Sequence, residues 1–272
     1  MRVGFVGAGR MGAPMVTRLS GAGHDVRVLA RSPERAPAIT ELGAQPVADL
    51  GEVGRDAEAV IVCVFTDDQV RHICLDGDLL TGMAAGSVLV LHTTGSPRTA
   101  EAIAERAASR GIDVLDAPVS GGPHDVAAGH VTLFVGGGTD AVAKVTPVLS
   151  SYGDPVLHVG ATGAGQRVKL INNTLFAAQS GRVAEAARLA ERLGVDESTL
   201  LAALPPGSGT SRALTSIAAA GSAATFIAAV GDVIGKDVAV IRATVAELGS
   251  DLGVLDDIVD AGLASPSTSA NQ

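Results

Sequence analysis

The sequence predicts an α/β protein in which a doubly wound, mostly parallel sheet is followed by an all-helical domain. Uninterrupted apolar runs such as 59–64 and 88–91 are typical of parallel strands covered on both faces, and they alternate with helical periodicity. A glycine-rich turn follows the first apolar run, and strand patterns stop near Gly160. We therefore expect one domain over 1–162 and a second over 163–272, beginning with a long interdomain helix.

The individual elements follow from local patterns. Strands are expected at 3–7, 25–30, 59–64, 88–91, 113–118 and 131–135. A helix at 97–110 stops before Gly111, and a long helix at 166–193 is ended by Gly194. Asp196 is a suitable cap for a short helix that follows it. Further helices are expected near 211–220, 232–248 and 254–264.

The segment from Gly7 to Gly12 reads G-x-G-x-x-G between the first strand and a helix. Gly7 permits a tight turn, Gly9 lets the backbone approach a pyrophosphate, and Gly12 lets the helix pack closely on the strand. Unpaired N–H groups at the helix N-terminus favour the phosphates. This context indicates a dinucleotide-binding Rossmann domain, with an ordinary glycine-rich turn as the alternative. The loop residues expected to bind the cofactor are Gly7, Ala8, Gly9, Arg10, Met11 and Gly12.

The end of the second strand indicates which dinucleotide is bound. An NAD enzyme usually carries Asp or Glu there, to accept a hydrogen bond from the ribose 2′-hydroxyl. This chain has Arg31 nineteen residues after Gly12, followed by Ser32, and no carboxylate at the strand tip. A guanidinium pairs well with a 2′-phosphate. We expect NADP(H) to be favoured over NAD(H), with a solvated surface arginine as the alternative.

The composition argues against several other classes of function. The formal net charge is −9 and the isoelectric point is near 5.1, so nucleic acid and anionic membranes are disfavoured as partners. The two cysteines lack metal-ligand spacing, and no metal site is expected. No apolar run reaches the ~18 residues of a membrane span, and no signal peptide precedes the first strand. A cytoplasmic protein is therefore expected.

Two further segments carry candidate chemistry. Ser120, with exposed N–H groups at Gly121 and Gly122, predicts a small anion-binding concavity, although a plain glycine-rich turn is the alternative. Lys169 and Asn173 are four residues apart and share one face of the long helix, which is expected to begin at the domain junction. A lysine on that face can donate a proton to a carbonyl oxygen that receives a hydride. A solvated Lys–Asn pair is the other interpretation.

These motifs, together with the segment from Asp116 to Gly122 and the pair Lys236-Asp237, occur in the order found in a known family. The chain resembles the β-hydroxyacid dehydrogenases, which include 3-hydroxyisobutyrate dehydrogenase, tartronate semialdehyde reductase and glyoxylate/succinic semialdehyde reductases. The resemblance covers residues 1–264. It implies that Lys169 is catalytic. It implies that the substrate carboxylate is bound by Ser120, Gly121, Gly122 and Asn173, and that cofactor contacts come from Val64, Phe65, Gln69, Thr94 and Lys236.

The function expected from the residues and the resemblance is reversible hydride transfer between NADP(H) and a small 3-hydroxy acid or its semialdehyde. Lys169 is expected to act as the proton donor or acceptor, and one visible anion site predicts a small carboxylate substrate. An imine reductase-like NADPH enzyme is an alternative that Lys169 disfavours, and a non-catalytic NADP-binding module is another. A homodimer or homotetramer through the helical domain is expected. No role is assigned to Arg167, His92 or His124, although His124 is either a specificity residue or a surface histidine.

Overall fold

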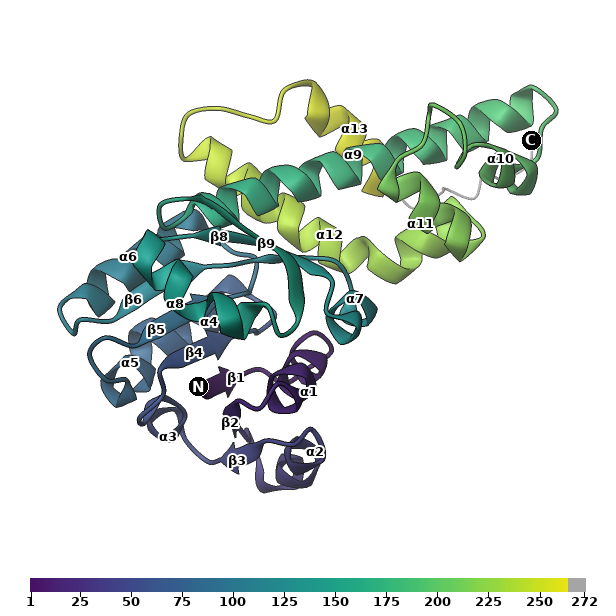
Figure 1. Cartoon of the computed structure of the whole chain (residues 1–272). Coiled ribbons are helices and arrows are strands. Elements are labelled where there is room, and N and C mark those ends of the chain that lie inside the picture. The colour runs from purple at the N-terminus through teal and green to yellow at the C-terminus, as the bar shows by residue number, and fades with distance from the viewer. Residues whose placement is uncertain (264–272) are drawn as a thin grey trace. The chain divides into compact units, whose positions relative to one another are not determined.

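The structure, a computed structural model, describes residues 1–263 (Figure 1). Contacts within the chain divide it into two compact units, Met1–Lys169 and a second that begins at Leu170. The boundary lies inside the helix α9 (Ala164–Arg192). The division predicted after residue 162 lies just before this helix begins, whereas the two compact units meet within it.

Within the described residues, nine strands of the first unit form one sheet (Figure 1). Their bounds are β1 (Arg2–Val6), β2 (Asp25–Leu29), β3 (Gln45–Val47), β4 (Ala59–Val62), β5 (Val88–Leu91), β6 (Asp113–Asp116), β7 (Val119–Ser120), β8 (Val131–Gly136) and β9 (Gly153–Gly160). The order along the sheet is β3-β2-β1-β4-β5-β6-β8-β7, and β9 pairs with β8. The ladders from β3 to β6 are parallel, whereas β8 runs antiparallel to both β6 and β7. The mostly parallel sheet predicted from the sequence is confirmed.

Helices cover this sheet on both faces, as a doubly wound fold requires. They are α1 (Gly12–Gly21), α2 (Ala36–Glu41), α3 (Leu50–Gly54), α4 (Asp67–Arg71), α5 (Leu79–Gly82), α6 (Pro97–Ala108), α7 (Pro123–Ala128) and α8 (Thr139–Leu149). Ile61 of β4 packs in one core cluster with Leu19 of α1, while its neighbour Val60 packs in a second cluster with Ile103 of α6. Successive strand residues point to opposite faces, so the apolar run of β4 supplies both cores.

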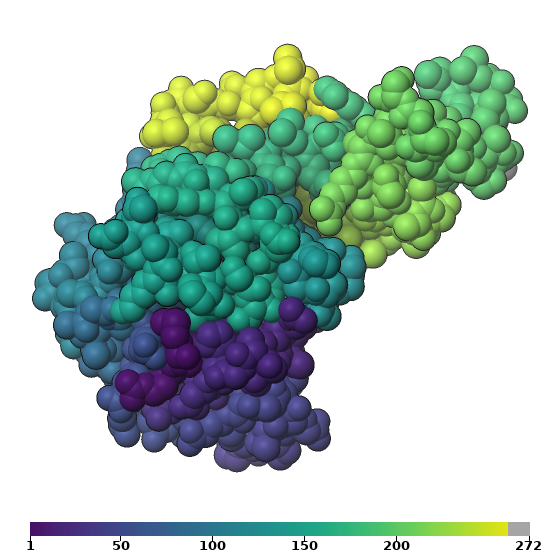
Figure 2. All heavy atoms as spheres, in the orientation of Figure 1, coloured from purple at the N-terminus to yellow at the C-terminus, as the bar shows by residue number. Residues whose placement is uncertain are grey.

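The strand β9 differs from the central strands. Most of its residues are exposed or half-buried, and they lie in the teal surface of the first unit in Figure 2. It pairs in parallel with β8, with register shifts along the ladder. Backbone pairing rather than side-chain burial therefore holds this strand in the sheet.

The second unit contains helices in its described part, with no strand there. These are the C-terminal part of α9, α10 (Glu197–Ala203), α11 (Arg212–Ala220), α12 (Ala223–Ala246) and α13 (Val254–Leu263). Side chains of Asp196, Ser211 and Ser222 accept backbone N–H groups at the starts of α10, α11 and α12. The all-helical character predicted for this region is confirmed.

Two apolar clusters hold the second unit together. Phe226 of α12 packs with Leu214 and Ile217 of α11, and its ring lies edge-on to Phe176 with 6.1 Å between ring centroids. Ile234 of α12 packs with the C-terminal part of α9 and with α13 in the other cluster. Of the described helices, none is alone long and apolar enough to cross a membrane. The pair α11 and α12 passes that test of length and composition together, bent by 115° at its break.

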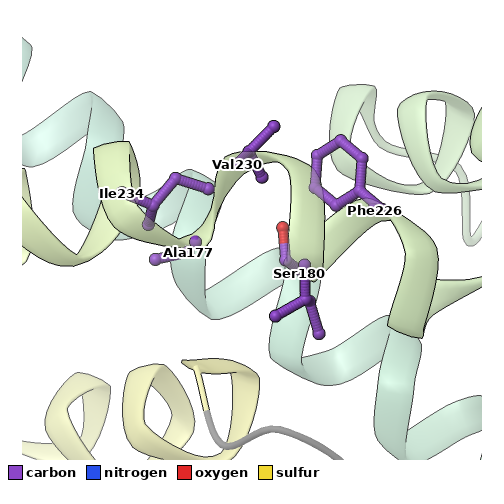
Figure 3. A pocket seen from close by; sticks show the side chains of 7 residues that line it. Ala177, Ser180, Phe226, Val230 and Ile234 are labelled. Atoms are coloured by element: carbon purple, nitrogen blue, oxygen red, sulfur yellow. The ribbon is translucent and has the colours of Figure 1, made fainter.

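A small hollow in the second unit is lined by side chains of α9 and α12, which pack against each other around it (Figure 3). It is lined by Ala177, Ser180, Phe226, Ile227, Val230, Gly231 and Ile234. The hydroxyl of Ser180 points into this apolar lining in Figure 3, but it already donates to the carbonyl of Phe176 on its own helix, at 2.9 Å. The hollow thus lacks the convergent polar groups of a ligand site.

The residue after β5, His92, is buried and links three parts of the first unit. Its Nδ1 lies 2.5 Å from the carbonyl oxygen of Ala117, and its Nε2 lies 2.8 Å from the hydroxyl of Tyr152. Because a carbonyl only accepts, Nδ1 carries the proton and Nε2 accepts from the tyrosine. Burial lowers the pKa of His92 from its ordinary value of 6.5 to about 4. The structure thus gives His92 a structural role that the sequence analysis left unassigned.

The depressed pKa makes His92 a source of acid sensitivity. The unfolded chain binds a proton at this residue below about pH 6.5 and the folded chain only below about 4, so folding loses stability as the pH falls through this window. At pH 4, the free energy of unfolding contributed by this residue has fallen by about 3 kcal/mol. We expect His92→Gln to have a free energy of unfolding that falls less steeply from pH 6.5 to 4, measured by urea titration. The control His72→Gln, at an exposed histidine, should show the same dependence of unfolding free energy on pH as the parent. If the His92→Gln and parent curves run parallel, His92 is not the source of the acid sensitivity.

Candidate functional site

The turn between β1 and α1 is shaped by close backbone approaches. Gly7 has a φ of +104°, and a Cβ there would lie 2.2 Å from the carbonyl oxygen of Cys63. A Cβ on Gly12 would lie 2.1 Å from the carbonyl oxygen of Gly7. A Cβ on Gly9 would instead meet no described atom within 4 Å, and Arg10 beside it is exposed. The turn is therefore tight on its inner side and open where a ligand would approach.

The tip of β2 carries charges of both signs. Arg31 is exposed, and Ser32 precedes the short 3₁₀ helix Pro33–Arg35 with extended backbone. A hydrogen bond from the Ser32 side chain lowers the pKa of Glu34. The sequence analysis found no acid at the strand tip itself, but the structure brings this exposed carboxylate back to Ser32.

Val64, Phe65 and Gln69 lie beyond the end of β4. The Gln69 side-chain oxygen accepts the backbone N–H groups of Phe65, at 2.9 Å, and Thr66, at 3.1 Å, as part of the capping box of α4. Phe65 is 58% exposed, and Val64 is half-buried. The Gln69 oxygen is therefore occupied by the helix cap.

Thr94 lies in the loop between β5 and α6, and hydrogen bonds hold the backbone on both sides of it. The side-chain oxygen of Gln166 accepts the N–H of Gly95 at 3.0 Å, while its Nε2 donates to the carbonyl of Thr93 at 2.8 Å. Asp67 accepts the N–H of Ser96 at 3.0 Å. Sequence analysis missed Gln166, for which the only signal was its place inside the glycine–lysine motif of the long helix.

The Ser120–Gly122 segment differs in one respect from the expected concavity. Gly121 has the positive φ of a turn, at +138°, but the N–H of Gly122 is not exposed: it donates to Asp125 Oδ2 at 2.6 Å. The expectation of two exposed N–H groups is thus wrong for Gly122, because Asp125 caps the first turn of α7. His124 Nε2 lies 3.4 Å from the same oxygen with its side chain 84% exposed, as expected of a surface histidine.

The start of α9 is held by Asp116, the last residue of β6. Its carboxylate is fully buried and accepts the N–H groups of Gly163, at 2.6 Å, and Gln166, at 2.7 Å. Burial raises the pKa of Asp116 to about 6, although these two hydrogen bonds act in the opposite direction. A Cβ on Gly165 would lie 2.5 Å from the carbonyl oxygen of Asp116. The helix start therefore packs directly on the end of the strand.

Lys169 follows in the second turn of α9 and is 8% exposed. Arg167, on the exposed side of this helix, forms an ion pair with Glu101 of α6, with Nη2 and Oε1 2.5 Å apart. This contact explains Arg167, which the sequence analysis left without a role. The first turns of α9 thus bury one cation, Lys169, and leave the other in a surface ion pair.

The remaining predicted residues, Asn173 and Lys236, lie in the second unit and meet at Asp237. Asn173 Nδ2 donates to Asp237 Oδ2, and Lys236 Nζ lies 2.7 Å from Asp237 Oδ1 as an ion pair. That Oδ1 accepts no hydrogen bond among the described residues, so its attraction to Lys236 is Coulombic. Asp237 is 3% exposed and was not among the predicted site residues, although it follows Lys236 in sequence.

Among residues 1–263, no group of three or more His, Cys, Asp or Glu side chains is arranged to hold a metal ion.

Comparison with known proteins identifies the family. Residues 2–160 match the family model described as the NAD binding domain of 6-phosphogluconate dehydrogenase. Residues 163–265 match the model described as "NAD-binding of NADP-dependent 3-hydroxyisobutyrate dehydrogenase". The two matches together span most of the chain.

Individual relatives agree with these models. The chain is 36% identical over 213 residues to a 3-hydroxyisobutyrate dehydrogenase of Pseudomonas aeruginosa, covering 78% of this chain and 72% of the relative. It is 34% identical over 214 residues to an NAD-dependent L-serine dehydrogenase of the same organism, with the same coverage of the two chains. The solved structure of Mycobacterium tuberculosis 3-hydroxyisobutyrate dehydrogenase with L-serine superimposes with a TM-score of 0.85, at 29% identity, covering 96% of this chain and 92% of that one.

The resemblance indicated by the motifs is confirmed by the models, the relatives and the fold. The chain belongs to the β-hydroxyacid dehydrogenase family and is an oxidoreductase that acts on the CH–OH group of a hydroxy acid with a nicotinamide dinucleotide.

Proposed function

We propose that this chain catalyses reversible hydride transfer between NADP(H) and a small 3-hydroxy acid or its semialdehyde, with Lys169 as proton donor or acceptor. The observation that carries the proposal is the burial of Lys169 at the start of α9, five residues after Ala164 begins that helix. Lysine is rarely buried to this extent, so the position is a candidate for a functional charge.

The β1–α1 turn fits a dinucleotide. Gly7 and Gly12 have no room for a side chain, whereas Gly9 borders open space at the N-terminal end of α1. This combination gives a pyrophosphate access to backbone N–H groups. When bound, the nicotinamide supplies or accepts the hydride. We propose that further cofactor contacts come from Ala8, Arg10, Met11, Arg31, Ser32, Val64, Phe65, Gln69, Thr94 and Lys236.

Lys169 would act on the substrate oxygen. During reduction, its ammonium donates a proton to the carbonyl oxygen as negative charge develops there, and during oxidation the neutral amine accepts the proton from the hydroxyl. Asn173 lies one helical turn further along α9, on the same face, and we propose that it holds the substrate beside this lysine. Ser120 and Gly121 are proposed to bind the substrate carboxylate, with Gly122 taking part if Asp125 releases its N–H.

Two of the relatives support a small substrate by their names, which refer to 3-hydroxyisobutyrate and L-serine. Both compounds are short hydroxy acids with one carboxylate. The expected assembly as a homodimer or homotetramer stays a prediction.

Replacing the proposed proton donor should remove turnover but not cofactor binding. We expect Lys169→Met to lower kcat by about 10² to 10⁴ at saturating substrate, because general acid assistance contributes rates of that order. NADPH affinity, measured by fluorescence titration, should stay close to that of the parent. Lys144→Met, at an exposed lysine of α8, is the matched control. A loss of only a few-fold for Lys169→Met would rule out this role.

The cofactor preference should depend on Arg31. A charged contact to the 2′-phosphate contributes roughly 1.5 to 3 kcal/mol, or about ten- to a hundredfold in affinity. The parent is expected to favour NADPH over NADH in kcat/KM, and Arg31→Asp should flatten or reverse that preference. Arg106→Asp, at an exposed arginine in the last turn of α6, should leave it unchanged. Equal kcat/KM for the two cofactors in the parent would mean that Arg31 is merely solvated.

The substrate range should reflect one anion site. Short semialdehydes and 3-hydroxy acids, such as 3-hydroxyisobutyrate or 3-hydroxypropionate, are expected to exceed dicarboxylic or phosphorylated analogues in kcat/KM. A second carboxylate buried without a partner would cost several kcal/mol. The measurement is kcat/KM for each compound in a panel of such substrates, with turnover followed by the absorbance of NADPH. A tenfold preference for tartronate or for a phosphorylated hydroxy acid would contradict the one-anion pocket.

A further inference from the structure

Gln166 is a buried polar residue whose contacts the proposed chemistry does not use. Its side chain is 2% exposed, and both of its polar atoms bond to backbone in the loop between β5 and α6. The oxygen accepts from Gly95 and the nitrogen donates to Thr93, so the two bonds fall on either side of Thr94. One amide therefore fixes the peptides that flank a proposed cofactor contact.

Gln166, which lies in the first turn of α9, is also tied to the end of β6 by its own backbone. Its N–H donates to Asp116 at 2.7 Å, and the other oxygen of that carboxylate accepts from Gly163. Gln166 lies three residues before Lys169, so the two side chains project from adjacent turns on one side of α9. The end of β6, the start of α9 and the Thr94 loop thus form one hydrogen-bonded unit.

The two loop bonds do more than fill space in the core. They satisfy buried backbone groups of Thr93 and Gly95, which an apolar side chain at this position would leave unpaired. The helix start is already held by Asp116, and the Thr94 loop is already held on its far side by Asp67. What Gln166 adds is a rigid connection between that loop and the turn that carries Lys169.

We propose that Gln166 is a positioning residue, which fixes the Thr94 loop relative to Lys169 so that hydride transfer and proton transfer occur in one geometry. This inference rests on the proposed function. A misplacement of about 1 Å between reacting groups is enough to cost on the order of a hundredfold in rate. Loss of the Gln166 bonds should therefore slow chemistry without weakening the binding of cofactor or substrate in proportion.

The test compares Gln166→Met, which keeps the length and removes both bonds, with Glu101→Gln. The control breaks the Arg167 ion pair on the neighbouring residue of α9 but leaves the Thr94 loop bonds intact. We expect Gln166→Met to lower kcat by about 10- to 100-fold, with NADPH affinity and substrate KM within about threefold of the parent. The primary deuterium isotope effect on kcat, measured with deuterated NADPH, should rise because hydride transfer becomes rate-limiting. Glu101→Gln should keep kcat within about twofold.

A second readout does not depend on activity. Amide hydrogen exchange of the loop containing Gly95 should be faster in Gln166→Met than in Glu101→Gln or in the parent. Unchanged exchange would overturn the inference, and so would a parent-like kcat in a variant that still unfolds cooperatively. If Gln166→Met does not fold, Gln166→Glu decides: it keeps an acceptor for Gly95 and loses the donor to Thr93, and a parent-like kcat and isotope effect would overturn the inference.

The same assays separate this inference from the proposed function. If the parent transfers hydride and Lys169→Met does not, a fully active Gln166→Met overturns the positioning role alone. If the parent reduces none of the semialdehydes, the proposed function fails, and hydrogen exchange still reports whether Gln166 holds the loop.

Discussion

The contact on which the site depends most is the pair of hydrogen bonds from the start of α9 to Asp116. A fully buried carboxylate is costly, and its pKa of about 6 reflects that burial. The two backbone N–H groups it accepts would otherwise be unpaired at a buried helix end. Gly165 is required beside it because the backbone atoms of β6 and β8 leave no space for a Cβ. This contact fixes where α9 begins and hence where Lys169 lies in the first unit.

Other buried polar side chains also form hydrogen bonds with backbone groups near the carboxyl ends of the strands. His92 bonds the carbonyl of Ala117, and the hydroxyl of Thr93 both donates to the backbone of Val64 and accepts from it. Gln166 then joins the Thr93 backbone to α9. Ligands of parallel α/β sheets bind beyond the carboxyl ends of the strands, where loops would otherwise be mobile. Satisfied buried hydrogen bonds make these loops rigid, as a site for directed proton and hydride transfer requires.

Charge is distributed in a way that suits an anionic substrate on an acidic protein. The net charge of −9 repels anions at long range, so local cations and N–H groups must bind them. Two cations of the motif segments are already paired: Arg167 with Glu101, and Lys236 with Asp237. Asp125 also accepts the N–H of Gly122. Cations paired in this way are partly neutralised, which is one reason why we propose a small ligand with one carboxylate.

The sequence alone determined the fold class and the main motifs, because these depend on residues close together in the chain. Apolar runs marked β4 and β5, and the spacing of three glycines marked the β1–α1 turn. It did not reveal β9, whose exposed residues resemble a loop until β8 pairs with them, nor β3, three residues long and paired with β2. Only the tertiary structure decided the partners of His92, Asp116 and Gln166, which lie 25 to 73 residues away in the chain. A motif records which side chains are present, but a buried polar group acquires its role from the distant backbone that folding brings to it.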